Sequence, residues 1–401
     1  MAIVVQKYGG TSVGTIDKIK NVAQRVAKSR AKGDAVVVVV SAMGKTTDIL
    51  LGMADEISLT PDRRELDMLM SSGEQVSIAL LSIALKELGY DSISLTGPQA
   101  GILTKGFHTK ARITDIEIEN VKKHISEGKI VVVAGFQGVD GDGNITTLGR
   151  GGSDTTAVAL AAKLGSVCEI YTDVDGIYTV DPRLYKVAKK LDYICYEEMV
   201  EMASLGAGVM ETRSIEIAQR FNVPIYVALS TEDWPGTYIK EFDESMESKV
   251  ITGLSVSDDD MMITINHVPY AVGNISMIFE KLASNDINVD MISQTAPSRG
   301  RVNISFTAPK EDKFSIDKLM SDIKSKLQEI EIDVEKDITK LSVVGIGMKS
   351  QSGVASKMFK IFAEEEIEFK QVTTSEIRIS YTINTHDKEK AVIAVAKEFN
   401  L

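Results

Sequence analysis

The sequence predicts an α/β fold in which a domain with a largely parallel sheet is followed by two small ferredoxin-like modules. Over the first 240 or so residues, short β-branched segments alternate with helical apolar spacing. The remainder repeats itself at a spacing of 80 residues, which indicates two copies of one module. The length of 401 residues agrees with this organisation, because a typical domain takes about 150 residues.

Strands and helices alternate along the first part of the chain. Continuous apolar segments predict buried strands at residues 35–40, 130–134, 168–172 and 223–229. Apolar spacing predicts helices between them at residues 16–30, 74–88, 114–127 and 154–164. Parallel strands need right-handed crossovers, and their ligands bind at the carboxyl ends of the strands. Functional residues are therefore expected just after the strands.

The repeat begins beyond an acidic connector at residues 241–247. It matches Gly273 with Gly353, Ser276 with Ser356, Phe279 with Phe359, Ala283 with Ala363 and Ile287 with Ile367. Each copy is predicted to contain a strand, a helix (274–284 or 354–364), two strands (288–293 and 302–308, or 368–373 and 377–384) and a second helix (316–328 or 388–399). This is the βαββαβ pattern of ferredoxin-like units. The strand near residues 251–256 is expected to pair with either the first or the second copy.

Composition and charge exclude several classes of protein. The net charge of −12 gives no support for binding nucleic acid or an anionic membrane surface. Two cysteines and four scattered histidines predict neither a disulfide framework nor a metal site. We expect no secretory leader and no membrane-spanning helix, and therefore a cytoplasmic protein.

A glycine-rich segment follows the first predicted strand and precedes the first helix. It runs Lys7-Tyr8-Gly9-Gly10-Thr11-Ser12-Val13-Gly14. Glycines there let backbone amides approach a phosphate, and a helix amino end favours negative charge. A plain tight turn is the alternative, but it needs neither three glycines nor a lysine at the strand end. We interpret the segment as a phosphate site.

Two further segments stand before predicted helices. Gly149-Arg150-Gly151-Gly152-Ser153-Asp154 suits a bound carboxylate or phosphate, since arginine binds such groups bidentately. The alternative is that Ser153 or Asp154 simply caps the helix. Ser71-Ser72-Gly73-Glu74-Gln75 fits a capping box, with Glu74 compensating the helix dipole.

Among the other candidate motifs, two are rejected and one allows two interpretations. Gly44-Lys45-Thr46 is not a P-loop, because Val39 stands where its first glycine belongs. Residues 140–144 are interpreted as a hairpin turn, because the remaining positions of a calcium loop are missing. The loop at residues 171–183 offers tyrosines, carboxylates and Arg183 to a nucleotide, but the same residues also suit a solvated turn.

Together these segments resemble the aspartokinases of the amino-acid kinase family, over essentially the whole chain. Residues 7–13 are similar to the KFGGTSV signature of that family, and the blocks at 41–44, 72–74, 135–138, 149–154 and 172–183 match in order. The resemblance implies a three-layer αβα kinase domain at residues 1–245 and two ACT domains at 246–335 and 336–401. It also implies phosphorylation of the aspartate side chain by ATP with Mg²⁺, the first step of lysine, threonine and methionine biosynthesis.

The resemblance also implies roles for individual residues. Catalytic roles fall to Lys7, Arg150 and Asp154. L-Aspartate would contact Ser41, Thr47, Glu74, Arg150, Gly151, Gly152 and Ser153. The nucleotide would contact Lys7, Tyr8, Gly9, Gly10, Thr172, Asp173, Tyr178, Arg183, Val209 and Met210. Gly208 replaces a lysine that the family often carries near the nucleotide.

Regulation is implied for the repeated modules. An effector amino acid, lysine with or without threonine, would contact Gly273, Asn274, Ile275, Asp290, Ser293 and Gln294. Tyr270-Ala271-Val272-Gly273 departs from the more frequent Asp-Arg-Pro-Gly of the family. The modules would also join the chain into a homodimer or a dimer of dimers. A pair that only dimerises, without a ligand, is the alternative.

Two alternative functions compete with the hypothesis of a regulated aspartokinase. Another amino-acid kinase with a different acidic substrate would lack the tandem ACT pair and the Ser-Gly-Glu block. A non-catalytic amino-acid sensor would not need intact motifs around Lys7, Arg150 and Asp154. A carboxylate nucleophile with a pKa near 3.9 needs no general base, which agrees with motifs that contain no histidine.

Overall fold

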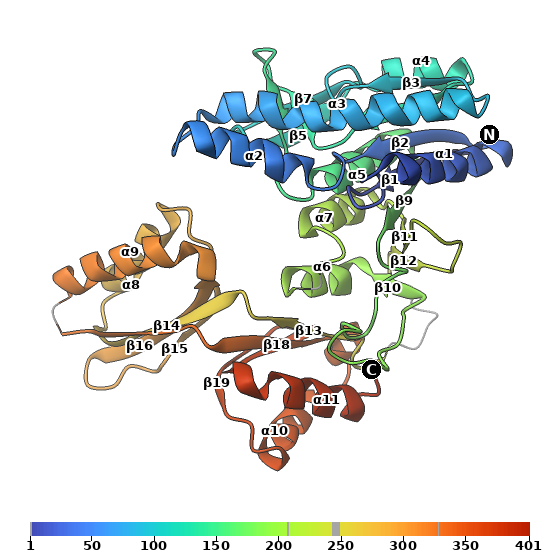
Figure 1. Cartoon of the computed structure of the whole chain (residues 1–401). Helices are drawn as coiled ribbons and strands as arrows, with labels where there is room; N and C mark the ends of the chain where they lie inside the picture. Colours follow the sequence, from blue (N-terminus) through green and yellow to red (C-terminus); the bar gives the residue numbers. More distant parts are fainter. Residues whose placement is uncertain (1, 207, 243–248, 328) are drawn as a thin grey trace. The chain divides into compact units, whose positions relative to one another are not determined.

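The computed structural model describes residues 2–206, 208–242, 249–327 and 329–401. They form two compact units, each described here by itself (Figure 1). The first unit comprises Met1–Ile177, Lys190–Ser204 and Gly208–Glu244, and the second comprises Tyr178–Lys189, Leu205–Ala207 and Ser245–Leu401. The domain boundary expected after residue 245 lies outside the described residues.

An eight-stranded sheet organises the first unit, in the order β10-β12-β11-β9-β1-β2-β6-β3. Its pairs from β11 to β3 are parallel, whereas β12 runs antiparallel to β11. The strands are β1 (Ile3–Tyr8), β2 (Ala35–Val40), β3 (Ser92–Leu95), β6 (Ile130–Ala134), β9 (Val167–Thr172), β10 (Tyr193–Cys195), β11 (Ile225–Leu229) and β12 (Thr237–Lys240). The helices are α1 (Ile16–Ala31), α2 (Thr46–Ile57), α3 (Arg63–Glu87), α4 (Glu119–Ser126), α5 (Gly152–Leu164), α6 (Tyr196–Ser204) and α7 (Thr212–Phe221).

Helices cover both faces of this sheet, which gives the expected three layers. β2 and β6 are buried at every residue, as continuous apolar runs predict for parallel strands between helices. One core joins alternate residues of these strands to α1 and α3, and includes Val38, Val132, Val22 and Leu81. α4 packs on β6, and α5 packs on β1, β2 and β9. The buried sheet therefore fixes where its loops emerge.

A small second sheet belongs to the same unit and corrects one prediction. Its order is β5-β4-β7-β8, with β4 (Ile102–Lys105), β5 (Arg112–Ile116), β7 (Gln137–Val139) and β8 (Ile145–Thr147). Residues 114–116 were predicted to be helical but lie in β5, where Ile116 pairs with Ile102. The expected hairpin turn is confirmed: Asp140 accepts hydrogen bonds from the backbone amides of Asp142 and Asn144 between β7 and β8.

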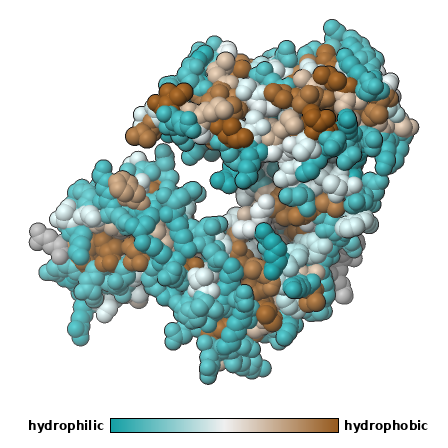
Figure 2. Space-filling view, viewed as in Figure 1, coloured by the Kyte–Doolittle hydropathy of each residue, from teal (hydrophilic) through white to brown (hydrophobic). Residues whose placement is uncertain are grey.

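The long helix α3 corrects a second prediction. It begins after Asp62, whose carboxylate accepts from the Arg64 and Glu65 amides, so Ser72 and Gln75 are mid-helix and form no capping box. The helix is long and apolar enough to cross a membrane by length and composition alone, but half of its most apolar window is buried inside the unit, as in the core helix of a soluble domain. Apolar side chains also lie on the surface over α2 and α3 (Figure 2). The exposed apolar residues of these helices include Ile49 and Ile83.

The second unit contains the two repeated modules. The first is β14 (Asp260–Pro269), α8 (Val272–Ala283), β15 (Asp290–Gln294), β16 (Arg301–Pro309), α9 (Lys313–Lys326) and β17 (Glu331–Glu335). The second is β18 (Ile338–Val344), α10 (Val354–Glu364), β19 (Phe369–Thr374), β20 (Arg378–Asn384) and α11 (Lys388–Glu398). Short 3₁₀ helices are η1 (Lys310–Asp312), η2 (Ile346–Lys349) and η3 (Thr385–Asp387). The order β15-β16-β14-β17 makes the first module a complete βαββαβ unit.

The second module takes its missing strand from earlier in the chain. β13 (Gly253–Ser257) precedes the first module, yet it pairs antiparallel with β18 in the order β13-β18-β20-β19. Leu254 of β13 joins the core formed by Leu341, Tyr381 and Val392. The strand near residues 251–256, for which both partners were considered, thus belongs to the sheet of the second copy.

Candidate active site

The predicted glycine-rich motifs meet at one edge of the parallel sheet. Tyr8 of β1 pairs with Val40 of β2 and with Tyr171 of β9. Val40 also pairs with Ala134 of β6. The segments that leave the sheet at this edge begin at Gly9, Ser41, Gly135 and Asp173. The carboxyl ends of four strands thus form the position where ligands bind in α/β sheets.

A buried ion pair lies at this edge. The Lys7 Nζ atom, near the end of β1, is 2.5 Å from the Asp154 carboxylate in the first turn of α5. Both residues are 8% exposed. A Cβ on Gly9 would lie 3.5 Å from Lys7 Nζ, so the glycine-rich loop passes directly beside the ammonium group. The structure therefore brings together residues from two motifs that are far apart in sequence.

Only glycine fits at position 10, because the loops after β1 and β2 approach each other closely there. Its carbonyl accepts from the Gly44 amide at 3.0 Å. A Cβ on Gly10 would lie 2.8 Å from the Ala42 carbonyl oxygen, closer than real Cβ atoms come. The loops that follow β1 and β2 therefore pack backbone against backbone.

The Arg150 loop is equally tight, and it is not built by side-chain capping. Gly149 and Gly151 have φ values of 78° and 64°, the left-handed region that favours glycine. Gly151 is the N-cap of α5 and makes no side-chain capping bond. Asp154 instead pairs with Lys7, so the alternative in which it caps the helix is wrong, and Ser153 is buried without capping. The Arg150 side chain is exposed.

Glu74 is a buried carboxyl in the middle of α3. It is 2% exposed, and one oxygen accepts from the Ala42 amide at 3.0 Å. The other oxygen, Oε2, has no hydrogen-bond partner among the described residues. Burial raises the pKa of Glu74 to about 8, although the hydrogen bond from Ala42 opposes this. Such a group is suited to a cationic ligand, which would satisfy the second oxygen.

The absence of a side chain at Gly73 lets α2 and the loop after β2 pack closely against α3 beside Glu74. A Cβ on Gly73 would lie 2.8 Å from the Ala42 Cβ atom and 3.4 Å from Thr46 Cγ2. The Ser-Gly-Glu block is therefore a packing motif inside a helix, and it carries the buried Glu74. Ser41 and Thr47 flank Ala42 and Thr46 in the sequence, so the structure brings these two predicted substrate residues to the same region.

A cavity of about 170 Å³ opens where β1, β9 and β11 end. It is lined by the predicted Asp173, by Ser12 of the glycine-rich segment, and by residues that the motifs did not single out, including Lys18, Ser230 and Thr231. Ser12 Oγ is buried and has no hydrogen-bond partner among the described residues. Ser230 and Thr231 directly follow β11, so the rule that ligands bind at strand ends would have found them.

The remaining predicted nucleotide residues are more scattered. Tyr8 is fully buried, and its ring stacks on Tyr171 with centroids 5.0 Å apart. Its side chain thus belongs to the core, and we expect any contact of Tyr8 with a nucleotide to come from its backbone. Thr172 donates to the Asp173 carboxylate at 3.2 Å.

The other predicted nucleotide residues lie in both units. Val209 and Met210 precede α7, and Met210 is buried. Ala207, beside Gly208, lies outside the described residues. Tyr178 and Arg183 belong to the second unit. Arg183 pairs with Asp181 at 2.7 Å and holds the pKa of that carboxyl below its usual value, although the Arg183 side chain is 90% exposed.

The predicted effector residues lie on two elements of the first module. Gly273, Asn274 and Ile275 are in the first turn of α8, and Asp290, Ser293 and Gln294 are in β15. The carboxylate of Asp290 lies 3.3 Å from Lys340 Nζ, and Gln371 of the second module donates to Ser293 Oγ at 3.0 Å. Burial disfavours ionisation of Asp290, but Lys340 nevertheless keeps its pKa below the usual value.

Known proteins match this chain over its full length. Residues 2–229 match the amino acid kinase family, and residues 341–399 match an ACT domain. Aspartokinase 2 of Bacillus subtilis is 47% identical over 402 residues, covering all of this chain and 98% of that protein.

Solved structures agree with these matches. Aspartokinase III of E. coli in complex with aspartate and ADP is 25% identical, covers 98% of this chain and 99% of its own, and superposes with a TM-score of 0.82. The complex of the same enzyme with lysine and aspartate covers 99% of each chain with a TM-score of 0.78. With the site geometry, the full-length identity and the ACT domain, these matches show that the chain belongs to the aspartokinases of the amino acid kinase family.

Proposed function

We propose that this chain transfers the γ-phosphoryl group of ATP to the side-chain carboxylate of L-aspartate, forming 4-phospho-L-aspartate and ADP. The observation that carries the proposal is the buried Lys7 ammonium, which lies between the glycine-rich loop after β1 and the first turn of α5. The E. coli relative binds aspartate and ADP, which supports the same pair of substrates here. The reaction would open the cytoplasmic synthesis of lysine, threonine and methionine.

The chemistry needs charge neutralisation more than proton transfer. An aspartate side chain has an ordinary pKa near 3.9, so the nucleophile is ionised at neutral pH. It must approach an anionic γ-phosphate, and this repulsion is the main barrier that the protein has to lower. Lys7 supplies a positive charge where the phosphoryl group passes, and the Gly10 amide adds a dipole. The Gly9 amide donates to the Tyr171 carbonyl at 3.3 Å.

The residues at the sheet edge fit a nucleotide with Mg²⁺. Mg²⁺ usually keeps several waters and binds through substrate phosphates plus one or two carboxylates. Asp154 is the carboxylate beside Lys7, and Asp173 lines the cavity at the ends of β1, β9 and β11. When bound, Mg²⁺ would neutralise phosphate charge. Asp154 also keeps the Lys7 side chain directed to this edge.

Substrate selection falls to Glu74 and the Arg150 loop. The unsatisfied Oε2 atom of Glu74 suits the aspartate ammonium group. Arg150, followed by a glycine pair and Ser153, offers a guanidinium and backbone amides to carboxylates. A short amino acid with two carboxylates satisfies both sites at once.

A hydroxylamine assay tests the function. Purified protein with ATP and Mg²⁺ should convert hydroxylamine and L-aspartate to the aspartyl hydroxamate, because hydroxylamine traps acyl phosphates. Parallel reactions with glutamate, N-acetylglutamate and no amino acid are the controls. Hydroxamate from glutamate but not aspartate would contradict the proposed substrate, and none from any acceptor would contradict catalysis.

We further propose that lysine, alone or with threonine, inhibits the enzyme by binding at α8 and β15, and that the modules form a homo-oligomer. The E. coli relative in complex with lysine supports this effector class. Adding lysine or threonine should lower the rate of hydroxamate formation.

Asn274→Ala should raise the half-inhibitory concentration of the effector amino acid about tenfold, as expected for a lost polar contact. Asn285→Ala, which removes an exposed amide beyond the end of the same helix, is the control. If neither amino acid inhibits, the modules serve only as an interface.

A further inference from the structure

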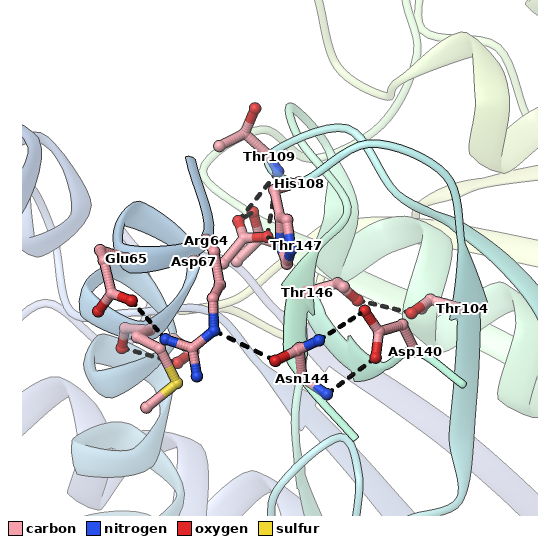
Figure 3. Close-up of polar contacts among 12 residues, drawn as sticks. Arg64, Glu65, Asp67, Thr104, His108, Thr109, Asp140, Asn144, Thr146 and Thr147 are labelled. Atoms are coloured by element: carbon pink, nitrogen blue, oxygen red, sulfur yellow. Dashed lines mark hydrogen bonds and ion pairs between the residues drawn. The ribbon is translucent and has the colours of Figure 1, made fainter. Parts of the chain in front are cut away.

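Asp67 is a fully buried carboxylate that none of the proposed catalytic steps uses. It lies on α3 and accepts three hydrogen bonds, from His108 Nδ1 at 2.7 Å, the Thr109 amide at 3.0 Å and Thr147 Oγ1 at 2.5 Å (Figure 3). A buried carboxylate is costly unless such donors surround it. Asp67 therefore ties two separate segments, the loop after β4 and the end of β8, to one helix.

Both tied segments adjoin the Arg150 loop. Thr147 ends β8 three residues before Arg150, and its carbonyl accepts from the Ala111 amide at 2.9 Å. Thr109 has a φ of 69°, which a β-branched residue adopts only when its surroundings hold it there. Its carbonyl oxygen lies 3.1 Å from the position of a Cβ on Gly149, so the strained loop backs directly onto the residue before Arg150.

Arg213 closes this arrangement from the other side. Its guanidinium donates to the Leu148 and Ala111 carbonyls at 3.1 Å each. The same two segments are thus joined to α3 through Asp67 and to α7 through Arg213. The chain segments that precede and contact the Arg150 loop are therefore held by hydrogen bonds from two different helices.

Asp67 and Glu74 lie on the same face of one helix. Asp67, Ser71 and Glu74 are spaced i, i+4 and i+7, and all three are buried. Ser71 accepts from Gln137 through its carbonyl at 2.9 Å, and Glu74 accepts from the Ala42 amide. Seven residues of helix span about 10 Å. A rigid element therefore separates the carboxyl group proposed for the aspartate ammonium from the anchor of the Arg150 loop.

We propose that Asp67 is a positioning residue that fixes the Arg150 loop relative to Glu74 and thereby sets the length of the dicarboxylic amino acid that the site accepts. This inference rests on the proposed function and deepens it. Aspartate and glutamate carry the same charged groups and differ by one methylene, so a site can separate them only by holding its two ends at a fixed distance.

Two neighbouring threonines of β8 provide the test. Thr147→Val removes a donor to Asp67, whereas Thr146→Val removes an equally buried hydroxyl that bonds Thr104 Oγ1 at 2.6 Å (Figure 3). We expect Thr147→Val to raise KM for aspartate about tenfold, with kcat and KM for ATP within about twofold. The ratio of kcat/KM for aspartate to that for glutamate should fall about tenfold as well. Thr146→Val should leave the aspartate KM and the ratio unchanged.

Asp67→Asn should change the same quantities more strongly, since it weakens all three bonds. Thermal melting of each variant shows whether it is folded, and Thr147→Val keeps the test decisive if Asp67→Asn does not fold. Equal effects of Thr147→Val and Thr146→Val on the aspartate-to-glutamate ratio would overturn the inference while leaving the proposed function intact. If the wild type forms no aspartyl hydroxamate, the proposed function itself fails.

Discussion

Replacing Lys7 with alanine is expected to lower kcat by at least about a thousandfold, because it removes the ammonium group that neutralises the transferred phosphoryl group. The substrate carboxylate and the γ-phosphate would then face each other without that compensation. The measurement is the rate of hydroxamate formation at saturating ATP and aspartate. A kcat near that of the wild type in folded Lys7→Ala would contradict the role of Lys7.

The control has to separate catalysis from stability. Lys7 and Asp154 are both buried, so alanine at position 7 leaves an unpaired buried carboxylate, a change that typically costs about 3–5 kcal/mol. Lys7→Met combined with Asp154→Asn removes both charges and should recover much of the lost stability without recovering activity. Lys20→Ala, which removes an exposed lysine of α1, should leave both unchanged.

Aspartate affinity is expected to rise steeply with pH until Glu74 is ionised. Burial raises the pKa of Glu74 from 4.5 to about 8, so at pH 6 to 7 the free protein holds this carboxyl protonated. Only the ionised form attracts the aspartate ammonium group, so KM for aspartate should fall about tenfold for each pH unit between about 6 and 8. Glu74→Gln should have a high KM that does not change with pH. Steady-state kinetics at saturating ATP measure this.

The same shift in pKa predicts how stability depends on pH. A carboxyl whose pKa rises on folding binds its proton more tightly in the folded chain. Its contribution to the free energy of unfolding is complete below about pH 4.5 and is lost as the pH rises to about 8. Glu74→Gln should remove this loss, while Glu65→Gln on the exposed first turn of α3 should keep it. For the kinetic prediction, a KM for aspartate that depends equally on pH in the wild type and in Glu74→Gln would contradict the proposal that Glu74 binds the aspartate ammonium group.

Local sequence patterns predicted the elements closely where burial is uniform. Residues 35–40 and 130–134 form strands as predicted, because strands buried on both faces need continuous apolar runs. The helix predicted at 354–364 also matches α10. Predictions of secondary structure were wrong where a short polar sequence is compatible with two different local structures. Ser72 and Gln75 fit a helix start but lie inside α3, and residues 114–116 fit a helix but lie in β5, which pairs with β4.

The sequence by itself determined the parallel α/β sheet, the repeated modules and the glycine-rich motifs, because these depend on apolar spacing and on residue types within short segments. Only the tertiary structure decided that Asp154 pairs with Lys7, that Asp67 holds Thr109 and Thr147, and that β13 completes the sheet of the second module. Each of these contacts joins segments at least 40 residues apart in the chain. Their partners are chosen by burial and backbone geometry, which no local pattern records.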